Sequence, residues 1–541
     1  MKHITCVAII MSSFIVNTAM ATTYYVKPNG DDAANGKSHA TAWKSIGQVN
    51  SFSAQTGDDV YFLAGGSWNK KQLSINWNGT DSNRAIIGSY YMNNGNETIG
   101  VPSGTNKPTI IGSYTGPCSG AAGSCINTSG AVPSGGYAGL IQVNANYVTI
   151  QNLRAQNSAG RGIVLNTNYH HAIFEGNEVY YTAGNSIIFN RGTSYNIMRN
   201  NDTSLCAIGW KQGDWIAVSK TWPTCNSAVE SHHNIFEGNY VHESYGEGIV
   251  MLIGSSYNIV RGNKIVGVRS TNIYMDNGSN NIIENNILIG DRDGEYTYNN
   301  APDGHKYGGG IDVKVESYSK MYDSVNNIVR NNLLFRTGGL LMGLEPEAEL
   351  EGRKLGVKFL NNTLIETASY IKLNDDSQFY DSVEIANNIF YGSLIAENGC
   401  KITPTQNVNV HHNHWGDLQN DADCIGNSGD TTGNPKLSRT NWDSVSITNI
   451  PSADDFKPKS DSPVINSAKA QTNSVFSLEF NHANELTGNC NIDLTEASKD
   501  FFCNNRDATP DMGAIDQNSI SITSVVTIDA PVGLTLTFSS N

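Results

Sequence analysis

The feature that most constrains the fold is a repeat of short apolar segments that end in asparagine, or in glycine followed by asparagine. Examples are "HAIFEGNEV" from position 171, "HNIFEGNYV" from 233 and "NNIVRNNLL" from 326. A period of about two dozen residues with β-branched alternation is typical of a parallel β-solenoid. The repeated asparagines stand at 177, 201, 239, 263, 286, 332, 362, 388 and 413.

The spacing of these asparagines predicts both the coil length and the insertions. Most steps are 23 to 30 residues long, whereas two steps are 38 and 46 residues. We expect one coil per step, with insertions of roughly 14 and 23 residues in the long ones, although 46 residues could also hold two coils. Stacked asparagines can hydrogen-bond along the axis as a ladder, which explains their recurrence without a catalytic role.

These patterns predict an all-β protein built as a right-handed parallel β-helix. The fixed leucine pattern of a leucine-rich repeat, which has a similar period, is absent from the sequence. An open solenoid end needs a cap, and the segment 41–53 spaces Trp43, Ile46, Val49 and Phe52 three apart, as in a short amphipathic helix. We therefore expect a β-helix with an N-terminal cap helix over 22–416 and a loop-rich C-terminal capping region over 417–541.

The N-terminus has the pattern of a secretory signal peptide over residues 1–21. Lys2 precedes an apolar run, and Ala19 and Ala21 form a small-residue cleavage site. We expect a secreted protein, extracellular or periplasmic. Eight cysteines follow the signal, and an even number in an exported chain favours disulfides. They form four sequence-close pairs, namely Cys118/Cys125, Cys206/Cys225, Cys400/Cys424 and Cys490/Cys503.

The charge balance excludes some partners. The formal net charge of −15 argues against nucleic acid and against an anionic membrane surface. After the signal, no apolar stretch is long enough to insert into a membrane as a helix. We expect a monomer.

Both ends of the chain resemble a known group of proteins. "TYYVKPNGDDAANGKSHATAWKSI" and "GDDVYFLAGG" near the N-terminus, and "SPVINSA" and "PDMGAID" near the C-terminus, resemble the flanks of secreted bacterial right-handed parallel β-helix proteins. Many members of that group are polysaccharide lyases. The resemblance implies a polysaccharide substrate, but it identifies an architecture and not a reaction.

Charged residues meet on the outer face of two adjacent coils when the inward residues are aligned. "GGGIDVKVES" at 308–317 carries Asp312 and Lys314, and the coil before it carries Tyr274 and Asp276. In this register Asp276 lies beside Lys314 and Tyr274 beside Asp312, at an interstrand spacing of about 4.8 Å. The aligned inward residues are Ile216, Ile249, Ile273, Ile311 and Leu340.

Two insertions next to this cluster are candidate walls of a glycan-binding cleft. The segment 203–230 contains Trp210, Trp215 and Lys220, and the segment 290–307 contains Arg292 and His305. Aromatic faces can stack on sugar rings, and long loops on a rigid scaffold often bind ligands. The alternative is that the tryptophans only pack against the coil wall.

One chemistry that suits the cluster is β-elimination from a uronic acid. Lys314 would be the base, with Tyr274 or His305 as the acid. Three carboxylates, those of Asp276, Asp312 and Glu247, would hold Ca²⁺.

The stretch "IDVKVES…NNIVRNNLLFRTGGLLMG" is similar to a region of alginate and chondroitin lyases in which a strand lysine is followed one coil later by an arginine. Lys314 matches that lysine. The arginine available in the next coil is Arg336, which is displaced to a position before the strand. We expect it to contact the substrate.

Two other functions remain open. In glycoside hydrolysis Asp276 and Asp312 would act as the carboxylate pair, at a separation within the roughly 6.5 to 9.5 Å of inverting enzymes. In a non-catalytic glycan-binding protein, Asp276 and Lys314 would form an ordinary exposed ion pair. Three adjacent histidine pairs recur at the coil period, which indicates turn residues rather than a metal site. These pairs are His170/His171, His232/His233 and His411/His412.

Overall fold

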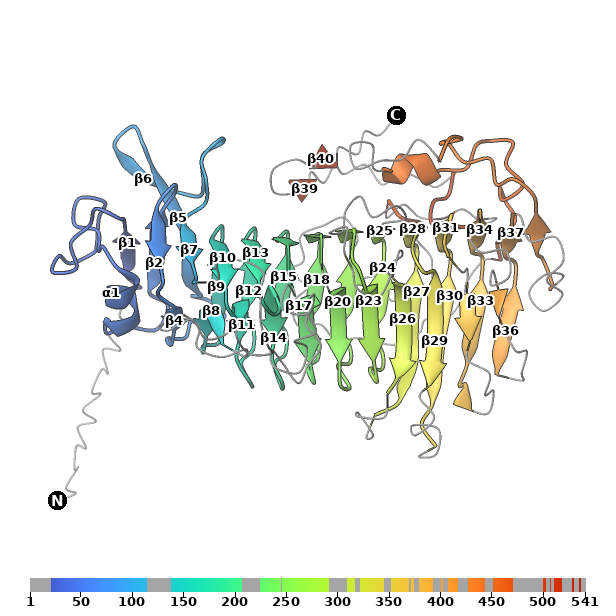
Figure 1. The fold of residues 1–541 in the computed structure, drawn as a ribbon, viewed down its shortest axis with the longest axis horizontal. Helices are drawn as coiled ribbons and strands as arrows, with labels where there is room; N and C mark the ends of the chain where they lie inside the picture. The colour runs from blue at the N-terminus through green and yellow to red at the C-terminus, as the bar shows by residue number, and fades with distance from the viewer. Residues whose placement is uncertain are drawn as a thin grey trace, which may run out of the picture.

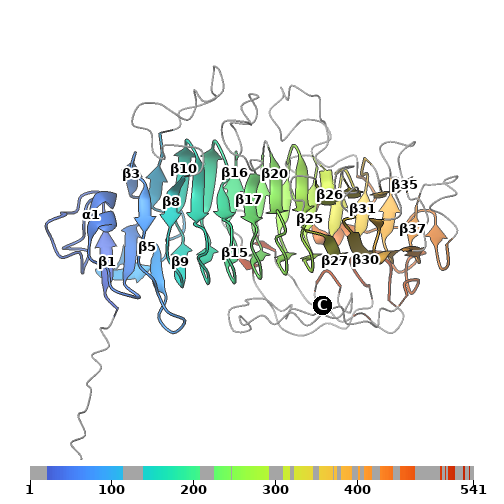
Figure 2. The same cartoon turned by 90° about the horizontal axis from the view of Figure 1, so that it is seen from below.

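The chain forms a stack of coils that together build three long parallel sheets (Figures 1 and 2). A computed structural model describes residues 21–113, 138–206, 224–244, 246–290, 309–316, 322–344, 352–368, 371–373, 379–392, 400–401, 407–416, 427–442, 451–469, 500–502, 506, 510–517, 528–529 and 535–536. Neighbouring strands within each sheet come from successive coils, which is the arrangement of a parallel β-helix. The predicted fold class is confirmed.

The first sheet follows the repeated segments of the sequence. Its strands pair in parallel, except that β6 (Asn96–Ile99) forms an antiparallel hairpin with β5. In order, the strands are β1 (Thr23–Val26), β2 (Asp59–Leu63), β5 (Ala85–Asn93), β9 (Val148–Gln151), β12 (Ile173–Glu175), β15 (Ile197–Arg199), β18 (Ile235–Glu237), β21 (Ile259–Arg261), β24 (Ile282–Glu284), β27 (Ser324–Arg330), β30 (Leu355–Leu360), β33 (Val383–Ala386) and β36 (Val408–His411).

From β9 onward, a strand of the second sheet begins two residues after each strand of the first. Its strands are β3 (Ser67–Asn69), β7 (Thr109–Ile111), β10 (Arg154–Ser158), β13 (Glu178–Thr182), β16 (Asp202–Ser204), β19 (Tyr240–His242), β22 (Lys264–Val266), β25 (Ile287–Ile289), β28 (Leu333–Phe335), β31 (Thr363–Ile365), β34 (Ile389–Tyr391), β37 (His414–Trp415) and β38 (Thr431–Thr432).

The third sheet carries the charged cluster. Its strands are β4 (Leu73–Ile75), β8 (Gly139–Val143), β11 (Arg161–Leu165), β14 (Ile187–Phe189), β17 (Thr224–Val229), β20 (Glu247–Leu252), β23 (Thr271–Asp276), β26 (Gly309–Val315), β29 (Leu340–Leu344), β32 (Ile371–Leu373) and β35 (Cys400–Lys401). A separate two-stranded sheet pairs β39 (Ile528–Asp529) with β40 (Thr535–Leu536).

Each long step of the repeat is a single coil that carries an insertion. Across the 38-residue step, Ile197 of β15 pairs directly with Ile235 of β18. Across the 46-residue step, Ile282 of β24 pairs directly with Ile328 of β27. The two-coil alternative for the longer step is therefore wrong.

The repeated asparagines form the predicted ladder. The side-chain amide of Asn239 donates to Oδ1 of Asn263 at 2.9 Å, and Asn263 donates to Asn286 at 3.0 Å. The residue before each asparagine makes the turn between the first and second sheets with a positive φ, as at Gly238 (61°) and Asn285 (57°). Glycine and asparagine tolerate this left-handed conformation best, which explains the recurring signature.

One core runs through the stack between the three sheets. It is built from the inward residues of each strand, such as Phe174 of β12, Val179 of β13 and Ile187 of β14, all fully buried. The short helix α1 (Ile46–Ser51) lies at the N-terminal end of the stack and buries Ile46 and Val49 in this core (Figure 1). Its role as a cap remains a prediction.

The described parts of the C-terminal region run back along the outer face of the second sheet (Figure 1). Trp442 packs on Phe335 of β28, with ring centroids 5.2 Å apart, and on Phe456 of the 3-10 helix η4 (Ala453–Phe456). The C-terminal half of that sheet is accordingly apolar on its outer face, as Ile287, Ile289, Leu333 and Ile365 show. No helix in the described ranges is long and apolar enough to span a membrane.

Candidate active site

The predicted register holds where the charges lie. Ile249, Ile273, Ile311 and Leu340 pair with one another on consecutive strands of the third sheet. In the same register Tyr274 aligns with Asp312, and Asp276 aligns with Lys314. The four side chains therefore lie on the outer face of β23 and β26, one coil apart.

The alignment of Ile216 is wrong. In the coil before β20 the strand is β17, and Asn226 takes the inward position that pairs with Ile249. Asn226 is fully buried, and a buried amide at an inward position breaks the apolar alternation on which the sequence prediction rests. Ile216 precedes this strand and lies outside the described residues.

The cluster is buried rather than solvated. Asp276 is 0% exposed, Tyr274 5% and Asp312 7%, whereas Lys314 is half-buried. The interpretation of Asp276 and Lys314 as an ordinary exposed ion pair is therefore wrong. Burying an ionised side chain is costly, so a buried group that is not fully paired changes its pKa. Clusters of side chains with shifted pKa values are typical of functional sites.

Tyr274 is held on both sides by residues of the next coil. Its hydroxyl donates a short hydrogen bond to Oε1 of Glu316, and the ammonium of Lys314 lies 5.4 Å from the centroid of its ring. The backbone N–H of Glu316 in turn donates to Oδ1 of Asn277 at 2.8 Å. Sequence analysis missed Glu316, although its place two residues after Lys314 on an alternating strand was the available signal.

Glu247 joins the cluster from the start of β20. It is 8% exposed, and none of the described residues donates a hydrogen bond to its Oε2 atom. Burial, reinforced by repulsion from Glu316 and Asp312, raises the pKa of Glu247 to about 8. Its carboxyl group is consequently protonated at neutral pH.

Asp312 is a second carboxyl group whose proton affinity is increased. Burial raises the pKa of Asp312, and attraction to Lys314 opposes that rise. The hydroxyl of Thr271 donates to its Oδ2 atom at 3.0 Å and fixes the orientation of the carboxyl group. The cluster thus combines one lysine, one tyrosine and carboxyl groups that differ in their tendency to hold a proton.

An apolar stripe continues the outer face of the third sheet toward the N-terminus. Its members lie in the same two outward rows as the cluster and are nearly fully buried. The stripe consists of Val164, Ile188, Val229, Val250 and Leu252, and it ends on Tyr274. The charged groups therefore lie at the edge of an apolar surface, which strengthens electrostatic interactions there.

Binding of Ca²⁺ by Glu247, Asp276 and Asp312 remains a prediction. Among the described residues, no group of three or more histidine, cysteine, aspartate or glutamate side chains is arranged to hold an ion. Glu247, Asp276 and Asp312 belong to one cluster without forming such a set.

Arg336 does not join the cluster. It follows β28 of the second sheet, where its guanidinium bonds to Glu366 at 2.8 Å and to the carbonyl of Trp442 at 3.0 Å. It is 6% exposed and lies over the ring of Phe335. Its charge is used to attach the C-terminal region, so the prediction that it contacts the substrate is wrong. The other predicted contacts, Trp210, Trp215, Lys220, Arg292 and His305, lie outside the described residues.

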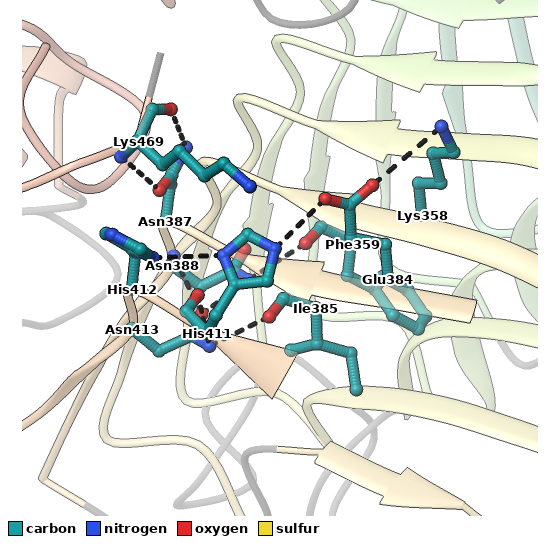
Figure 3. A network of polar contacts seen from close by, with 10 residues as sticks. All are labelled: Lys358, Phe359, Glu384, Ile385, Asn387, Asn388, His411, His412, Asn413 and Lys469. Atoms are coloured by element: carbon teal, nitrogen blue, oxygen red, sulfur yellow. Dashed lines mark hydrogen bonds and ion pairs between the residues drawn. The ribbon is translucent and has the colours of Figure 1, made fainter. Parts of the chain in front are cut away.

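A second polar network lies on the first sheet near its C-terminal end (Figure 3). Nε2 of His411 lies 3.1 Å from the carboxylate of Glu384, and Nζ of Lys358 lies 3.8 Å from it. The hydrogen bond from His411 lowers the pKa of Glu384. Asn387 exchanges two hydrogen bonds of 2.9 Å with the backbone of Lys469. This network connects the C-terminal region to the last coils.

The first two histidine pairs lie in the turns before β12 and β18, as predicted, whereas in the third pair His411 ends β36 and only His412 lies in the turn that follows. In each pair the two Nδ1 atoms lie 2.7 to 3.1 Å apart, so one imidazole donates to the other. The second histidine of the first two pairs stacks between tyrosines of neighbouring coils, at centroid distances of 4.6 to 5.3 Å. The stacked rings are Tyr147, His171, Tyr195, His233 and Tyr257.

Only part of the predicted cysteine pairing falls on described residues. Cys206 is disulfide-bonded, and its predicted partner Cys225 lies on β17. The four pairings as a set remain predictions.

The fold is that of known β-helix proteins. Pectate lyase Pel9A matches with a TM-score of 0.51 and 13% identity, over 92% of this chain and 98% of its own. XylC in complex with xylose matches with a TM-score of 0.50 and 10% identity, over 92% of this chain and 99% of its own. No protein-family model matches the chain, and no curated protein sequence is similar to it.

An alginate lyase from Paenibacillus matches less well, with a TM-score of 0.41 and 15% identity over 62% of this chain and 95% of its own. Identities this low show the fold alone. The resemblance to the parallel β-helix fold of polysaccharide lyases, predicted from the motifs at both ends, is therefore confirmed for the architecture, and the reaction has to be argued from the cluster.

Proposed function

We propose that the protein is a polysaccharide lyase that cleaves an acidic, uronate-containing glycan by β-elimination on the outer face of the third sheet. The main support for the proposal is the placement of Lys314 against Tyr274, next to Glu247, whose raised pKa keeps its carboxyl group protonated at neutral pH. A base, an acid and neutral hydrogen-bond donors for a substrate carboxylate are the groups that this reaction needs.

Each group has a role in the proposed reaction. Lys314, the most exposed group of β23 and β26 in the cluster, removes the proton beside the substrate carboxylate. The electron pair of that C–H bond forms the new double bond, and the glycosidic oxygen leaves with a proton supplied by Tyr274. Glu247 in its acid form donates a hydrogen bond to the substrate carboxylate, which avoids the repulsion that two carboxylates would cause.

The test uses the full chain and a panel of polyuronates, with the ultraviolet absorbance of unsaturated uronate and the reducing ends measured in parallel. Wild-type protein should release unsaturated product, and Lys314→Ala should lose at least about a hundredfold of that rate. Lys264→Ala is the matched control, because Lys264 lies on the second sheet, 5.9 Å from the ring of Tyr240 of the neighbouring coil. A Lys314→Ala protein that keeps the wild-type rate would refute the assignment of the base.

Glycoside hydrolysis is a second candidate, favoured by the raised pKa values of Glu247 and Asp312. A general acid must carry a proton at working pH, and burial achieves this for a carboxyl group. In this reaction Asp276 and Asp312 would be the essential pair and Lys314 would only orient them. New reducing ends without unsaturated product, and inactivity of both Asp276→Asn and Asp312→Asn, would favour the hydrolase.

We further propose that the protein is exported as a monomer after removal of residues 1–21. The signal-like N-terminus of the sequence supports export. Mass spectrometry of the mature N-terminus and light scattering of the purified protein test these two proposals separately.

A further inference from the structure

A cavity at the N-terminal end of the stack is separate from the cluster on the third sheet. Its volume is about 410 Å³, within the range of roughly 300 to 1,000 Å³ that is common for small-molecule sites. Five, six and seven strand-to-strand steps separate the coil of β4 from those of β20, β23 and β26, the strands that carry the cluster. At about 4.8 Å per step, the cavity lies roughly 25 to 35 Å along the axis from the cluster.

Two turns of the chain form the cavity wall. The first follows β1 and contributes Lys27, and the second joins β2 to β3. Backbone hydrogen bonds hold both turns, from the N–H of Lys27 to Trp43 at 2.8 Å and from the N–H of Gly66 to Leu63 at 2.9 Å. A side chain at Gly66 would come within 2.7 Å of the ring of Trp68, so this part of the wall has to remain backbone.

Lys27 contributes a positive charge to the cavity. Its side chain is half-buried, and its ammonium makes no ion pair with any residue in the described ranges. In a protein with a net charge of −15, a cation that lines a cavity favours an anionic ligand.

His39 is held rigidly beside Lys27. Its Nδ1 atom lies 3.0 Å from the hydroxyl of the fully buried Tyr90, and its backbone N–H donates to Glu97 at 2.7 Å. Burial, together with the nearby charge of Lys27, lowers the pKa of His39. With Nδ1 used by Tyr90, Nε2 is the polar atom of the ring left for a ligand. Asn29 adds an amide, and Pro28 and Leu63 add apolar surface.

We propose that this cavity is an accessory binding site for one acidic sugar unit of a glycan, with Lys27 binding the carboxylate and His39 and Asn29 binding hydroxyl groups. The choice of a uronate rests on the proposed function. The cavity would hold a polymer at a point distant from the cleavage site, and two linked sites raise the apparent affinity for a long chain far more than for a short one.

Binding of D-galacturonate and of D-galactose to the full chain is measured by titration calorimetry and ligand-observed NMR. Galacturonate should bind at a site that Lys27→Met weakens by about tenfold or more, since a charge-assisted hydrogen bond is lost. Lys37→Met is the matched control, because Lys37 is an exposed lysine of the same loop that does not line the cavity. It should bind galacturonate like the wild type.

The outcomes separate the two proposals. Equal binding of galactose and galacturonate, or wild-type binding by Lys27→Met, would overturn the accessory site. Loss of galacturonate binding in Lys314→Ala alone would also overturn it and leave the lyase proposal standing. Lys27-dependent binding in a protein that cleaves no polyuronate would support the accessory site and contradict the proposed function.

Discussion

The first and third sheets stack charged side chains at the same strand spacing but combine them differently. On the first sheet glutamate and arginine alternate from coil to coil, and three pairs form with N–O distances of 2.6 to 2.8 Å. On the third sheet several carboxyl groups gather around one lysine. The three pairs are Glu175–Arg199, Glu237–Arg261 and Glu284–Arg330, and the cluster contains Glu247, Asp276, Asp312, Lys314 and Glu316.

This difference distinguishes charges that are paired within the stack from charges that are buried together without such pairing. Alternating pairs compensate each other, so a β-helix can bury them along its whole length at small net cost. The cluster is not compensated in this way, and the pKa of Glu247 rises to about 8 as a result of burial and of neighbouring carboxylates. The stack can form without this cluster, and the cluster changes the pKa values of its members. Both properties are typical of a functional site.

Breaking a pair on the first sheet should give the largest effect on stability. Arg330 and Glu284 are 5% and 6% exposed in their side chains and lie 2.7 Å apart. Arg330→Met leaves a buried, uncompensated carboxylate and should lower the free energy of unfolding by about 3 to 5 kcal/mol. Denaturant titration measures this change. The double variant Arg330→Met, Glu284→Gln should recover much of it.

Arg353 provides the control for this pair, because it is 28% exposed and lies 3.9 Å from Asp323. Arg353→Met should change the free energy of unfolding by less than about 1 kcal/mol. Equal losses in Arg330→Met and Arg353→Met would contradict the view that the buried pairs compensate each other.

The cluster should make stability depend on pH in a defined direction. The pKa of Glu247 is about 8 in the folded protein, against 4.5 as its ordinary value. Between these values the folded state holds a proton that the unfolded state has released, so this group's contribution to stability is lost as pH rises from 4.5 to about 8. The loss is about 1.4 kcal/mol per pH unit. Denaturant titrations across this window should show that Glu247→Gln removes this slope.

Glu178 is the control of opposite sign. Its pKa is lowered, because the cations Lys107 and Arg154 outweigh the effect of burial. Its contribution should therefore be present above pH 4.5 and be lost as pH falls below it. If the free energy of unfolding has the same dependence on pH in wild-type protein and in Glu247→Gln, Glu247 has no raised pKa.

The asparagine ladder between the first and second sheets should give the smallest effect of the three on stability. Asn263 donates to Asn286 and to the carbonyl of Phe236, both at 3.0 Å, and accepts from Asn239. Asn263→Ala leaves buried polar groups without partners and should cost about 1 to 3 kcal/mol, measured by denaturant titration. The exposed Asn326, which donates to Asn280 at 3.3 Å, is the control. Asn326→Gly should be nearly neutral, because glycine tolerates the positive φ of 57° at this position, and an equal cost for both variants would contradict the ladder.

Much of the site could be predicted, because alternation along a strand and the repeat from coil to coil can both be read from neighbouring parts of the sequence. Once Ile273 and Ile311 are aligned as inward residues, Tyr274, Asp312 and Lys314 must face outward on adjacent coils. The same reasoning failed at Ile216, because Asn226 fills an inward position with a polar side chain. Alternation identifies the inward face only where apolar residues occupy it.

The sequence by itself determined the coil length, the ladder of asparagines, the positive-φ turns that precede them and the outward row of charges. Each of these depends on residues that are close in the chain or one repeat apart. Only the tertiary structure decided which charges are compensated and which are buried without compensation. Arg336 illustrates this, because its partners Glu366 and Trp442 come from the next coil and from the C-terminal region. Burial, and with it the pKa of Glu247, depends on every neighbour that excludes water, and no local pattern records all of them.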